Sequence, residues 1–215
     1  MGLTEVHVFV RAPIPGRTKT RLSARIGAEA ACALYRAFVE DTVDSLADLS
    51  ELSLVLAATE MHPFLEALAE RTGARLELQV EGDLGARMAA ALASGLRHGT
   101  RALVVGSDAP TLPSGLVLEA ARALDTCELV FGPAGDGGYV LVGARKVPRF
   151  APVRWSTRHA LADSWEANGE LVRGLVAPWY DVDEAEDLAL LRAHLRLDRA
   201  AAPRTARALE ALGRF

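Results

Sequence analysis

The chain of 215 residues has little cysteine, no long apolar run and no strong excess of charge of either sign. Its two cysteines, Cys32 and Cys127, have a spacing that suits neither a zinc site nor a disulfide framework, so we expect inert, buried thiols in a reducing compartment. The formal net charge is −4, with both signs dispersed along the chain. This argues against a nucleic-acid-binding protein, which usually carries a basic face.

Signals for secretion and membrane insertion are also missing. The first ten residues carry Glu5 and His7 where a secretory signal needs an apolar stretch. No run approaches the roughly 18 consecutive apolar residues that a membrane-spanning helix needs. We therefore expect a cytoplasmic protein without a membrane or nucleic-acid partner. Whether it is a monomer or a homodimer stays open.

Half of the residues are hydrophobic, and their pattern alternates between strand-like and helix-like segments. We expect strands at 5–10, 52–58, 75–80, 102–105, 129–131, 139–142 and 171–176. We expect helices at 24–49, 63–72, 84–98, 116–124, 158–168, 184–197 and 205–212. This alternation predicts one α/β domain over residues 1–215, a three-layer α/β/α arrangement with a mostly parallel, mixed sheet. In such sheets ligands bind outside the carboxyl ends of the strands.

The first segment that carries chemistry is RAPIPGRTKTRL, residues 11–22, directly after the first expected strand. It holds four cations, whose guanidinium and ammonium groups suit phosphate oxygens. Backbone N–H groups near its glycine and at the following helix start add donors. The segment is neither a Walker A loop nor a G-x-G-x-x-G fingerprint, so the alternative is a solvated basic loop. The residues that we predict to bind phosphate here are Arg11, Pro13, Gly16, Arg17, Lys19 and Arg21.

A single acid follows the fully apolar strand at 102–105, in the segment GSDAPTL. Mg²⁺ in proteins usually takes one or two carboxylates together with substrate phosphates, so we predict Asp108 to be a metal ligand. The alternative is that Ser107 or Asp108 caps a helix. However, the next expected helix starts later, and Ser114 is a better cap for it.

Two further segments predict contacts with substrate and nucleotide. In GPAGDGGYVLVG, residues 132–143, we predict Asp136, Gly137 and Gly138 to face a substrate, although the same letters suit a tight Asp-Gly hairpin turn. In EGDLGARM, residues 81–88, Arg87 is a candidate nucleotide ligand. Asp83 is equally a ligand or the N-cap of the helix that follows.

The last two segments are WST, residues 155–157, and DVDEAEDL, residues 181–188. Trp155 is either a wall of the substrate site or part of the core. Most acids of the second segment need no ligand, because carboxylates favour a helix start. We predict that Asp183 completes the metal site with Asp108. With no metal bound, these two carboxylates should repel each other, so removing either charge should leave the fold unharmed or stabilise it slightly.

Taken together, these segments resemble one family. The strings RAPIPGRTKTRL, EGDLGARM, GSDAPTL, GPAGDGGYVLVG, WST and DVDEAEDL occur in this order in the rSAM/selenodomain-associated transferases, which are classed with glycosyltransferases of the GT-A, or nucleotide-diphospho-sugar transferase, fold. The resemblance runs from about Val6 to about Leu191. The chain is more distantly similar to phospholactate guanylyltransferase and to the molybdenum-cofactor guanylyltransferases.

This resemblance implies a seven-stranded mixed sheet with one antiparallel strand. Many GT-A glycosyltransferases use a D-x-D pair, whereas this chain has Ser107-Asp108-Ala109 with a single acid. Nucleotidyltransferases of this fold commonly add a second carboxylate far downstream, where Asp183 lies. We therefore favour an enzyme that uses Mg²⁺ or Mn²⁺ to transfer a nucleotidyl group from a nucleoside triphosphate to a small phosphorylated acceptor, with Lys19, Arg21 and Asp108 as catalytic residues. The alternatives are a glycosyltransferase with a nucleotide-sugar donor and a non-catalytic nucleotide-binding module.

Overall fold

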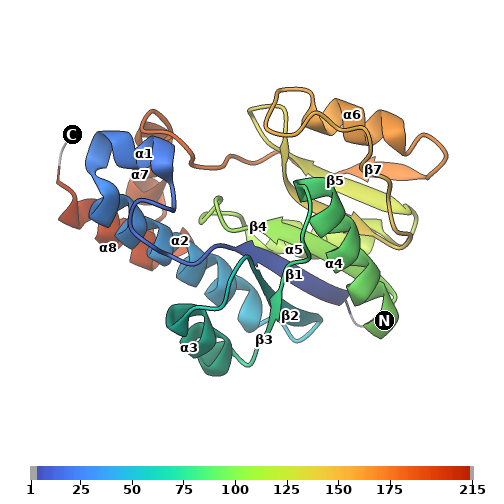
Figure 1. The fold of residues 1–215 in the computed structure, drawn as a ribbon, viewed down its shortest axis with the longest axis horizontal. Helices are drawn as coiled ribbons and strands as arrows, with labels where there is room; N and C mark the ends of the chain where they lie inside the picture. Colours follow the sequence, from blue (N-terminus) through green and yellow to red (C-terminus); the bar gives the residue numbers. More distant parts are fainter. Residues whose placement is uncertain (1–3, 214–215) are drawn as a thin grey trace.

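The computed structural model describes residues 4–213, which form an α/β fold around one seven-stranded sheet (Figure 1). The strand order is β3-β2-β1-β4-β6-β5-β7, and β6 runs antiparallel to both of its neighbours while the other pairs are parallel. The mixed, mostly parallel sheet with one antiparallel strand is therefore confirmed. The strands are β1 (Thr4–Val10), β2 (Leu52–Ala58), β3 (Arg75–Leu78), β4 (Arg101–Gly106), β5 (Leu129–Pro133), β6 (Tyr139–Ala144) and β7 (Arg173–Leu175).

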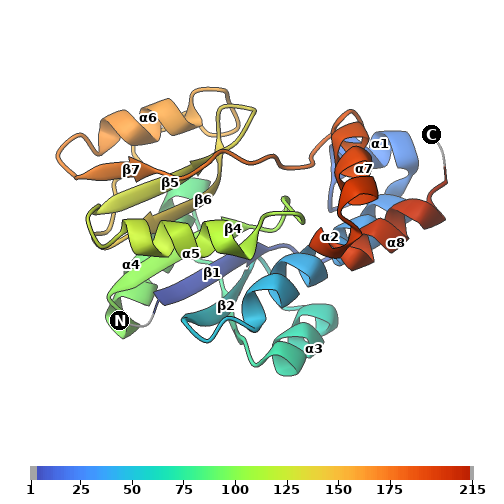
Figure 2. The ribbon, with the colours of Figure 1, turned by 180° about the vertical axis from the view of Figure 1, so that it is seen from behind.

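Helices cover both faces of this sheet, as Figures 1 and 2 show from opposite sides. On one face, Val8 and Val105 pack in a core with α2 (Ala28–Ala47), α3 (Pro63–Thr72) and α5 (Ser114–Ala123). On the other face, Val104 packs in a second core with α4 (Leu84–His98) and α6 (Ala160–Ala167). Adjacent residues of β4 thus enter different cores. A strand covered on both sides has to be apolar throughout, which explains the run ALVV.

A group of helices lies beyond the carboxyl ends of the central strands. It contains α1 (Thr20–Ile26), α7 (Asp187–Leu197), a short 3-10 helix (Arg199–Ala201) and α8 (Pro203–Ala211), which gather around the end of α2 (Figures 1 and 2). The chain reaches α1 after β1, and it returns to the group along the segment that follows β7. No helix of residues 4–213 is both long and apolar enough to span a membrane.

Several expected boundaries were wrong, and local backbone chemistry explains two of them. The expected helix at 24–49 is split into α1 and α2 at Gly27, whose φ of 87° a helix interior does not accept. Because α1 begins at Thr20, Arg21 lies on a helix instead of in the basic loop. Ser114 is the first residue of α5 and not its cap, because the chain turns into the helix at Pro113. The strands expected at 129–131 and 139–142 pair as the antiparallel hairpin β5-β6, joined at the Asp-Gly turn, and β6 lies inside the sheet.

Candidate active site

A cavity of about 650 Å³ opens at the carboxyl ends of β1 and β4. Nine of the predicted site residues line it: Arg11, Lys19, Arg21, Arg87, Asp108, Asp136, Gly138, Trp155 and Asp183. Arg17 lines a smaller neighbouring cavity of about 340 Å³, which it shares with Arg11 and Arg87. Pro13, Gly16, Asp83 and Gly137 line neither cavity. The main cavity therefore gathers residues from six separate stretches of the sequence.

The four predicted residues that line neither cavity cap a helix, shape the backbone or are buried. The carboxylate of Asp83 accepts a hydrogen bond from the amide of Ala86 at 2.8 Å, so it caps α4. Gly137 has a φ of 90°, and a side chain there would collide with the backbone of Arg158. Pro13 is buried, and Gly16 has the positive φ that the bend of the basic loop requires. Of the two roles predicted for Asp83, the structure therefore shows the N-cap of α4 and not a place at the cavity.

The basic loop folds around a buried threonine. The hydroxyl of Thr18 donates to the carbonyl of Ala12 at 2.9 Å and accepts from the amide of Ile14 at 3.4 Å. Immediately after it, Lys19 has φ 50° and ψ 48°, a left-handed conformation that is uncommon for a residue with a side chain. Within residues 4–213, the only other non-glycine residue with positive φ is Ser156, and both line the main cavity. Such backbone geometry tends to occur at functional sites.

The side chain of Lys19 lies between the two predicted metal ligands. Its ammonium nitrogen is 2.7 Å from Asp108 Oδ1, 2.6 Å from Asp183 Oδ1 and 2.6 Å from the carbonyl oxygen of Val182. We call these three oxygens the oxygen cage. Only 5% of the lysine side chain is exposed. Burial disfavours the charge on Lys19, but the two carboxylates outweigh it and raise the pKa of the ammonium.

The expectation that Asp108 and Asp183 repel each other in the metal-free protein, so that losing either charge does no harm, was therefore wrong. The two carboxylates do meet at one point, but a cation of the chain itself already separates them. Asp183 is held in place by its backbone, since its amide and that of Glu184 donate to Asp187 Oδ2 at 2.9 and 2.8 Å. Asp187 thus orders the turn before α7, although no acid of the segment makes a side-chain cap hydrogen bond to that helix.

Two further acids line the cavity. Asp136 sits on the β5-β6 turn, where its Oδ1 accepts from the amide of Gly138 at 2.8 Å. Asp181 lies on the segment that leads to α7. Burial, followed by the charges of Asp136 and Asp183, raises the pKa of Asp181 to about 6. Together with Asp108 and Asp183, four acids therefore line the cleft, a feature that suits a bound cation.

Two more cations of the segment 11–22 are also paired with acids. Arg17 binds Glu60 at 2.9 Å, and Arg21 approaches Glu184 at 3.4 Å, both on the surface. Together with the lysine, every cation between residues 17 and 21 has an acidic partner. An anionic ligand must therefore compete with these acids. Exposed ion pairs are weak, so the two arginines can exchange partners at little cost.

One residue that organises the site was missed by sequence reasoning. Tyr35 lies on the buried side of α2, and its hydroxyl accepts from the amide of Arg11 at 2.9 Å. The same hydroxyl is hydrogen-bonded to Ser107 Oγ at 2.9 Å. Burial raises the pKa of Tyr35 to about 12, so the hydroxyl stays neutral. Tyr35 thus ties the loops after β1 and β4 together, and nothing in the sequence distinguishes it from other apolar positions of the helix.

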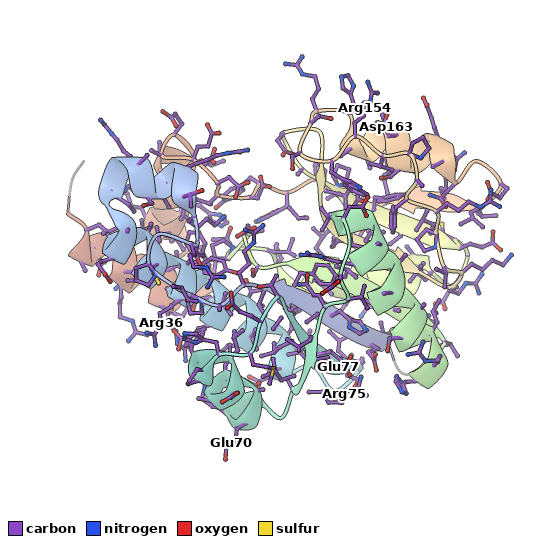
Figure 3. The ribbon with its side chains drawn as sticks, viewed as in Figure 1. Arg36, Glu70, Arg75, Glu77, Arg154 and Asp163 are labelled. Atoms are coloured by element: carbon purple, nitrogen blue, oxygen red, sulfur yellow. The ribbon has the colours of Figure 1, made fainter. Side chains whose placement is uncertain are left out.

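Aromatic side chains also line the cavity. Trp155 packs edge-on against Tyr139 and Phe150, so it belongs both to the core and to the site. The neighbouring Arg154 donates to both carboxylate oxygens of Asp163 on α6, at 2.7 and 2.8 Å, and Figure 3 shows the two side chains together. This bidentate pair anchors the loop that carries Trp155.

The donor set at the cage fits a divalent cation. Within residues 4–213, no group of three or more His, Cys, Asp or Glu side chains is arranged to hold a metal. The cage instead combines two carboxylate oxygens with one carbonyl oxygen, all directed at one positive centre. Oxygen ligands of this kind are those that Mg²⁺ prefers. Asp108 and Asp183 are the residues that would hold it.

The fold and this cleft define a protein of the GT-A-like nucleotide-diphospho-sugar transferase fold. The chain belongs to the family described as "Uncharacterized protein conserved in bacteria (DUF2064)", which matches residues 42–157. It is similar to the structure of a protein from Desulfovibrio desulfuricans that is provisionally assigned as a nucleotide-diphospho-sugar transferase, with 29% identity and a TM-score of 0.86. That match covers 97% of this chain and 96% of the other.

More distant structures share the fold. A cytidylyltransferase from Leptospira borgpetersenii has 12% identity and a TM-score of 0.61, over 97% of this chain and 93% of the other. Glucosyl-3-phosphoglycerate synthase from Mycobacterium tuberculosis, crystallised with Mn²⁺, uridine diphosphate and phosphoglyceric acid, has 15% identity and a TM-score of 0.57, over 94% and 78%. A comparison with curated proteins finds no match. The neighbours are transferases of two kinds, nucleotidyl and glycosyl.

Proposed function

We propose that the chain is a metal-dependent nucleotidyltransferase that uses a nucleoside triphosphate and a small phosphorylated acceptor. The observation that carries this proposal is the meeting of Asp108 with Asp183 at one cationic centre. The strand end offers one acid instead of a D-x-D pair, and the second acid comes from the distant approach to α7. The resemblance implies this arrangement for nucleotidyltransferases of the fold.

The residues of the cleft have distinct roles in such a reaction. Asp108 and Asp183 would hold a divalent cation, which would supply charge neutralisation at the phosphates. Lys19 and Arg21 carry donors for the phosphate oxygens, and Arg11, Arg17 and Arg87 line the adjoining smaller cavity. Positioning and charge neutralisation account for most of catalysis in phosphoryl-group chemistry, so no covalent intermediate is needed.

Glycosyl transfer is the second candidate, and the acidic wall of the cleft favours it. Asp136 and Asp181 face the cavity near the cage, where one could contact a sugar hydroxyl or accept its proton. The relative from Desulfovibrio desulfuricans and the synthase with bound Mn²⁺ and uridine diphosphate both carry names of this type. The two candidates share the metal and the nucleotide and differ in the leaving group.

One experiment separates the candidates. The protein is first screened by thermal shift against nucleoside triphosphates and nucleotide sugars, each with and without Mg²⁺ or Mn²⁺. A donor at about 100 times its Kd should stabilise the fold by roughly 2.7 kcal/mol. The stabilising donor is then incubated with a panel of phosphorylated and hydroxyl acceptors. Pyrophosphate release that requires both substrates supports the proposal. Release of a nucleoside diphosphate indicates glycosyl transfer, and binding without any turnover indicates a binding module.

A further inference from the structure

The oxygen cage is occupied by a lysine, a residue type that is rare in this chain. Only two of the 24 basic Lys and Arg residues are lysines, Lys19 and Lys146. An ammonium group is a compact charge with three donors, and it meets three oxygens at 2.6 to 2.7 Å in the cage. A planar guanidinium group directs its donors in a fork and does not match three oxygens around one point.

The same point is where a divalent cation would bind. Lys19 supplies one positive charge against two carboxylates, so the cage retains one negative charge. A divalent ion would neutralise both carboxylates and repel the ammonium. Both cations therefore compete for the same oxygens. The backbone of Lys19 is in the left-handed conformation, so the cage contacts also hold a backbone geometry that the residue otherwise disfavours.

We propose that Lys19 is an exchangeable cation, which occupies the cage in the free protein and moves to the phosphates of the nucleotide when a divalent ion takes its place. This inference rests on the proposed function for the identity of the ligand. Lys19 sits at the N-terminal end of α1 and lines the main cavity beside Arg21, so phosphate oxygens in the cavity offer it new acceptors. With no phosphate present, a metal ion would have to displace an ammonium that is buried and fully hydrogen-bonded.

It follows that metal and nucleotide bind cooperatively, because each one provides what the other requires. The nucleotide gives Lys19 an alternative partner, and the departure of Lys19 opens the cage. Coupling of this kind between two ligands usually changes each affinity by about 5- to 150-fold. In the absence of Lys19 the coupling should largely disappear, since the cage is then open to metal at all times.

The test measures Mn²⁺ binding without nucleotide, by electron paramagnetic resonance of the free ion, in the wild type and in Lys19→Met. We expect the variant to bind Mn²⁺ at least about tenfold more tightly than the wild type. The control is Lys146→Met, an exposed lysine paired with Glu128 that lines neither cavity, which should bind Mn²⁺ like the wild type. A Lys19→Met protein that binds Mn²⁺ no more tightly overturns the proposal.

A second measurement uses the unmodified protein, in case the variant does not fold. With ¹⁵N-lysine labelling, the two side-chain ammonium signals are assigned with the help of Lys146→Arg. We expect the Lys19 signal to shift when Mg²⁺ and inorganic tripolyphosphate are added together, and to shift far less with Mg²⁺ alone. An unchanged Lys19 signal at saturation with both overturns the exchange. Neither measurement depends on turnover, so failure of the transfer assay and failure of this inference are distinguishable.

Discussion

The amide of Val182 donates a hydrogen bond to the carbonyl oxygen of Asp108 at 2.9 Å, which joins the end of β4 to the segment before α7. This contact is made by backbone atoms alone. It places Asp183 beside Asp108 whatever side chains the two positions carry. Replacing either carboxylate by an amide should therefore change the charge of the oxygen cage and leave its shape.

The first prediction concerns Asp108→Asn and Asp183→Asn. Each variant should lose the effect of Mg²⁺ or Mn²⁺ on nucleotide binding, because one of two charged ligands is gone. Without ligand, each should lower the free energy of unfolding by roughly 1 kcal/mol, since Lys19 loses one charged partner whose side chain is about half exposed. Metal titration in the presence of nucleotide and urea denaturation give the two readings.

Glu186→Gln is the matched control for these variants. Glu186 belongs to the same acidic segment, is exposed and lines neither cavity, so its charge should not matter for the metal. If the metal effect disappears in Asp108→Asn alone, Asp183 is not a ligand and the preference for nucleotidyl transfer weakens. If both variants keep the effect, the metal site lies elsewhere.

The second prediction concerns Arg21→Ala. The side chain is 64% exposed and its partner Glu184 lies at 3.4 Å, so the melting temperature without ligand should barely change. Nucleotide binding at low salt should weaken roughly fivefold, equivalent to about 1 kcal/mol, and the loss should shrink at high salt as the charge is screened. Arg25→Ala, on the same helix but outside both cavities, should bind normally. Equal effects of the two substitutions would argue against a specific phosphate contact.

The sequence predicted the sheet well because parallel strands covered on both faces leave a strong signal. The run ALVV, for example, becomes the fully buried centre of β4. It predicted the acids of the cleft for a similar reason, since Asp108 and Asp183 stand at points where an element ends and polar groups emerge. What it could not predict was which acid each cation of the basic loop contacts. Nothing in the basic loop shows that Lys19 turns inward to the carboxylates while Arg17 and Arg21 remain on the surface.

The missed residue Tyr35 has a different cause. A tyrosine on the buried side of a long helix follows the same periodicity as leucine, and its hydroxyl matters only once two distant loops are placed next to it. The same holds for Asp83, where capping and ligand roles require the same residue at the same position. Side-chain direction, which the fold decides, separates these alternatives.

The third prediction follows from this role of Tyr35. Tyr35→Phe leaves the amide of Arg11 and the buried hydroxyl of Ser107 without this partner, which should cost about 1–3 kcal/mol of stability. Because the two loops carry Arg11 and Asp108, nucleotide affinity should fall as well. The comparison variant is Asp41→Ala, which removes a buried acceptor for the start of α8, far from both cavities. Asp41→Ala should lower stability and leave nucleotide affinity unchanged. If Tyr35→Phe has the same effect, Tyr35 does not position the nucleotide-binding residues.

The fourth prediction compares two helical glycines. A Cβ at Gly95 on α4 would lie 2.7 Å from the Cβ of Ala102 and 3.2 Å from His7 Nε2, so the helix would have to move away from the sheet. Gly95→Ala should therefore destabilise the fold by roughly 1–3 kcal/mol. Gly115→Ala on α5 meets nothing within 4 Å and should be neutral or slightly stabilising. Urea denaturation measures both free energies of unfolding. Equal values for the two variants would show that α4 packs less closely against the sheet than these distances indicate.

The last prediction concerns the buried pair of His7 and Glu5 beneath α4. His7 Nε2 lies 3.0 Å from Glu5 Oε1, and both side chains are 2% exposed. Arg75 binds the other oxygen of Glu5 at 2.7 Å, and His98 approaches that oxygen at 3.5 Å. Figure 3 shows Arg75 beside Glu77 at this edge of the sheet. Burial lowers the pKa of His7 below its ordinary 6.5, although Glu5 opposes the shift.

The sign of the resulting pH dependence follows from proton uptake. As the pH falls through 6.5, His7 becomes protonated in the unfolded chain but stays neutral in the folded protein. The free energy of unfolding therefore decreases. In His7→Gln this contribution is absent. The slope of unfolding free energy against pH, measured by urea denaturation between about pH 7.5 and about pH 5.5, should therefore be shallower in the variant, by at most about 1.4 kcal/mol per pH unit. Identical slopes in His7→Gln and the wild type would mean that the folded protein protonates His7 as readily as the unfolded chain does.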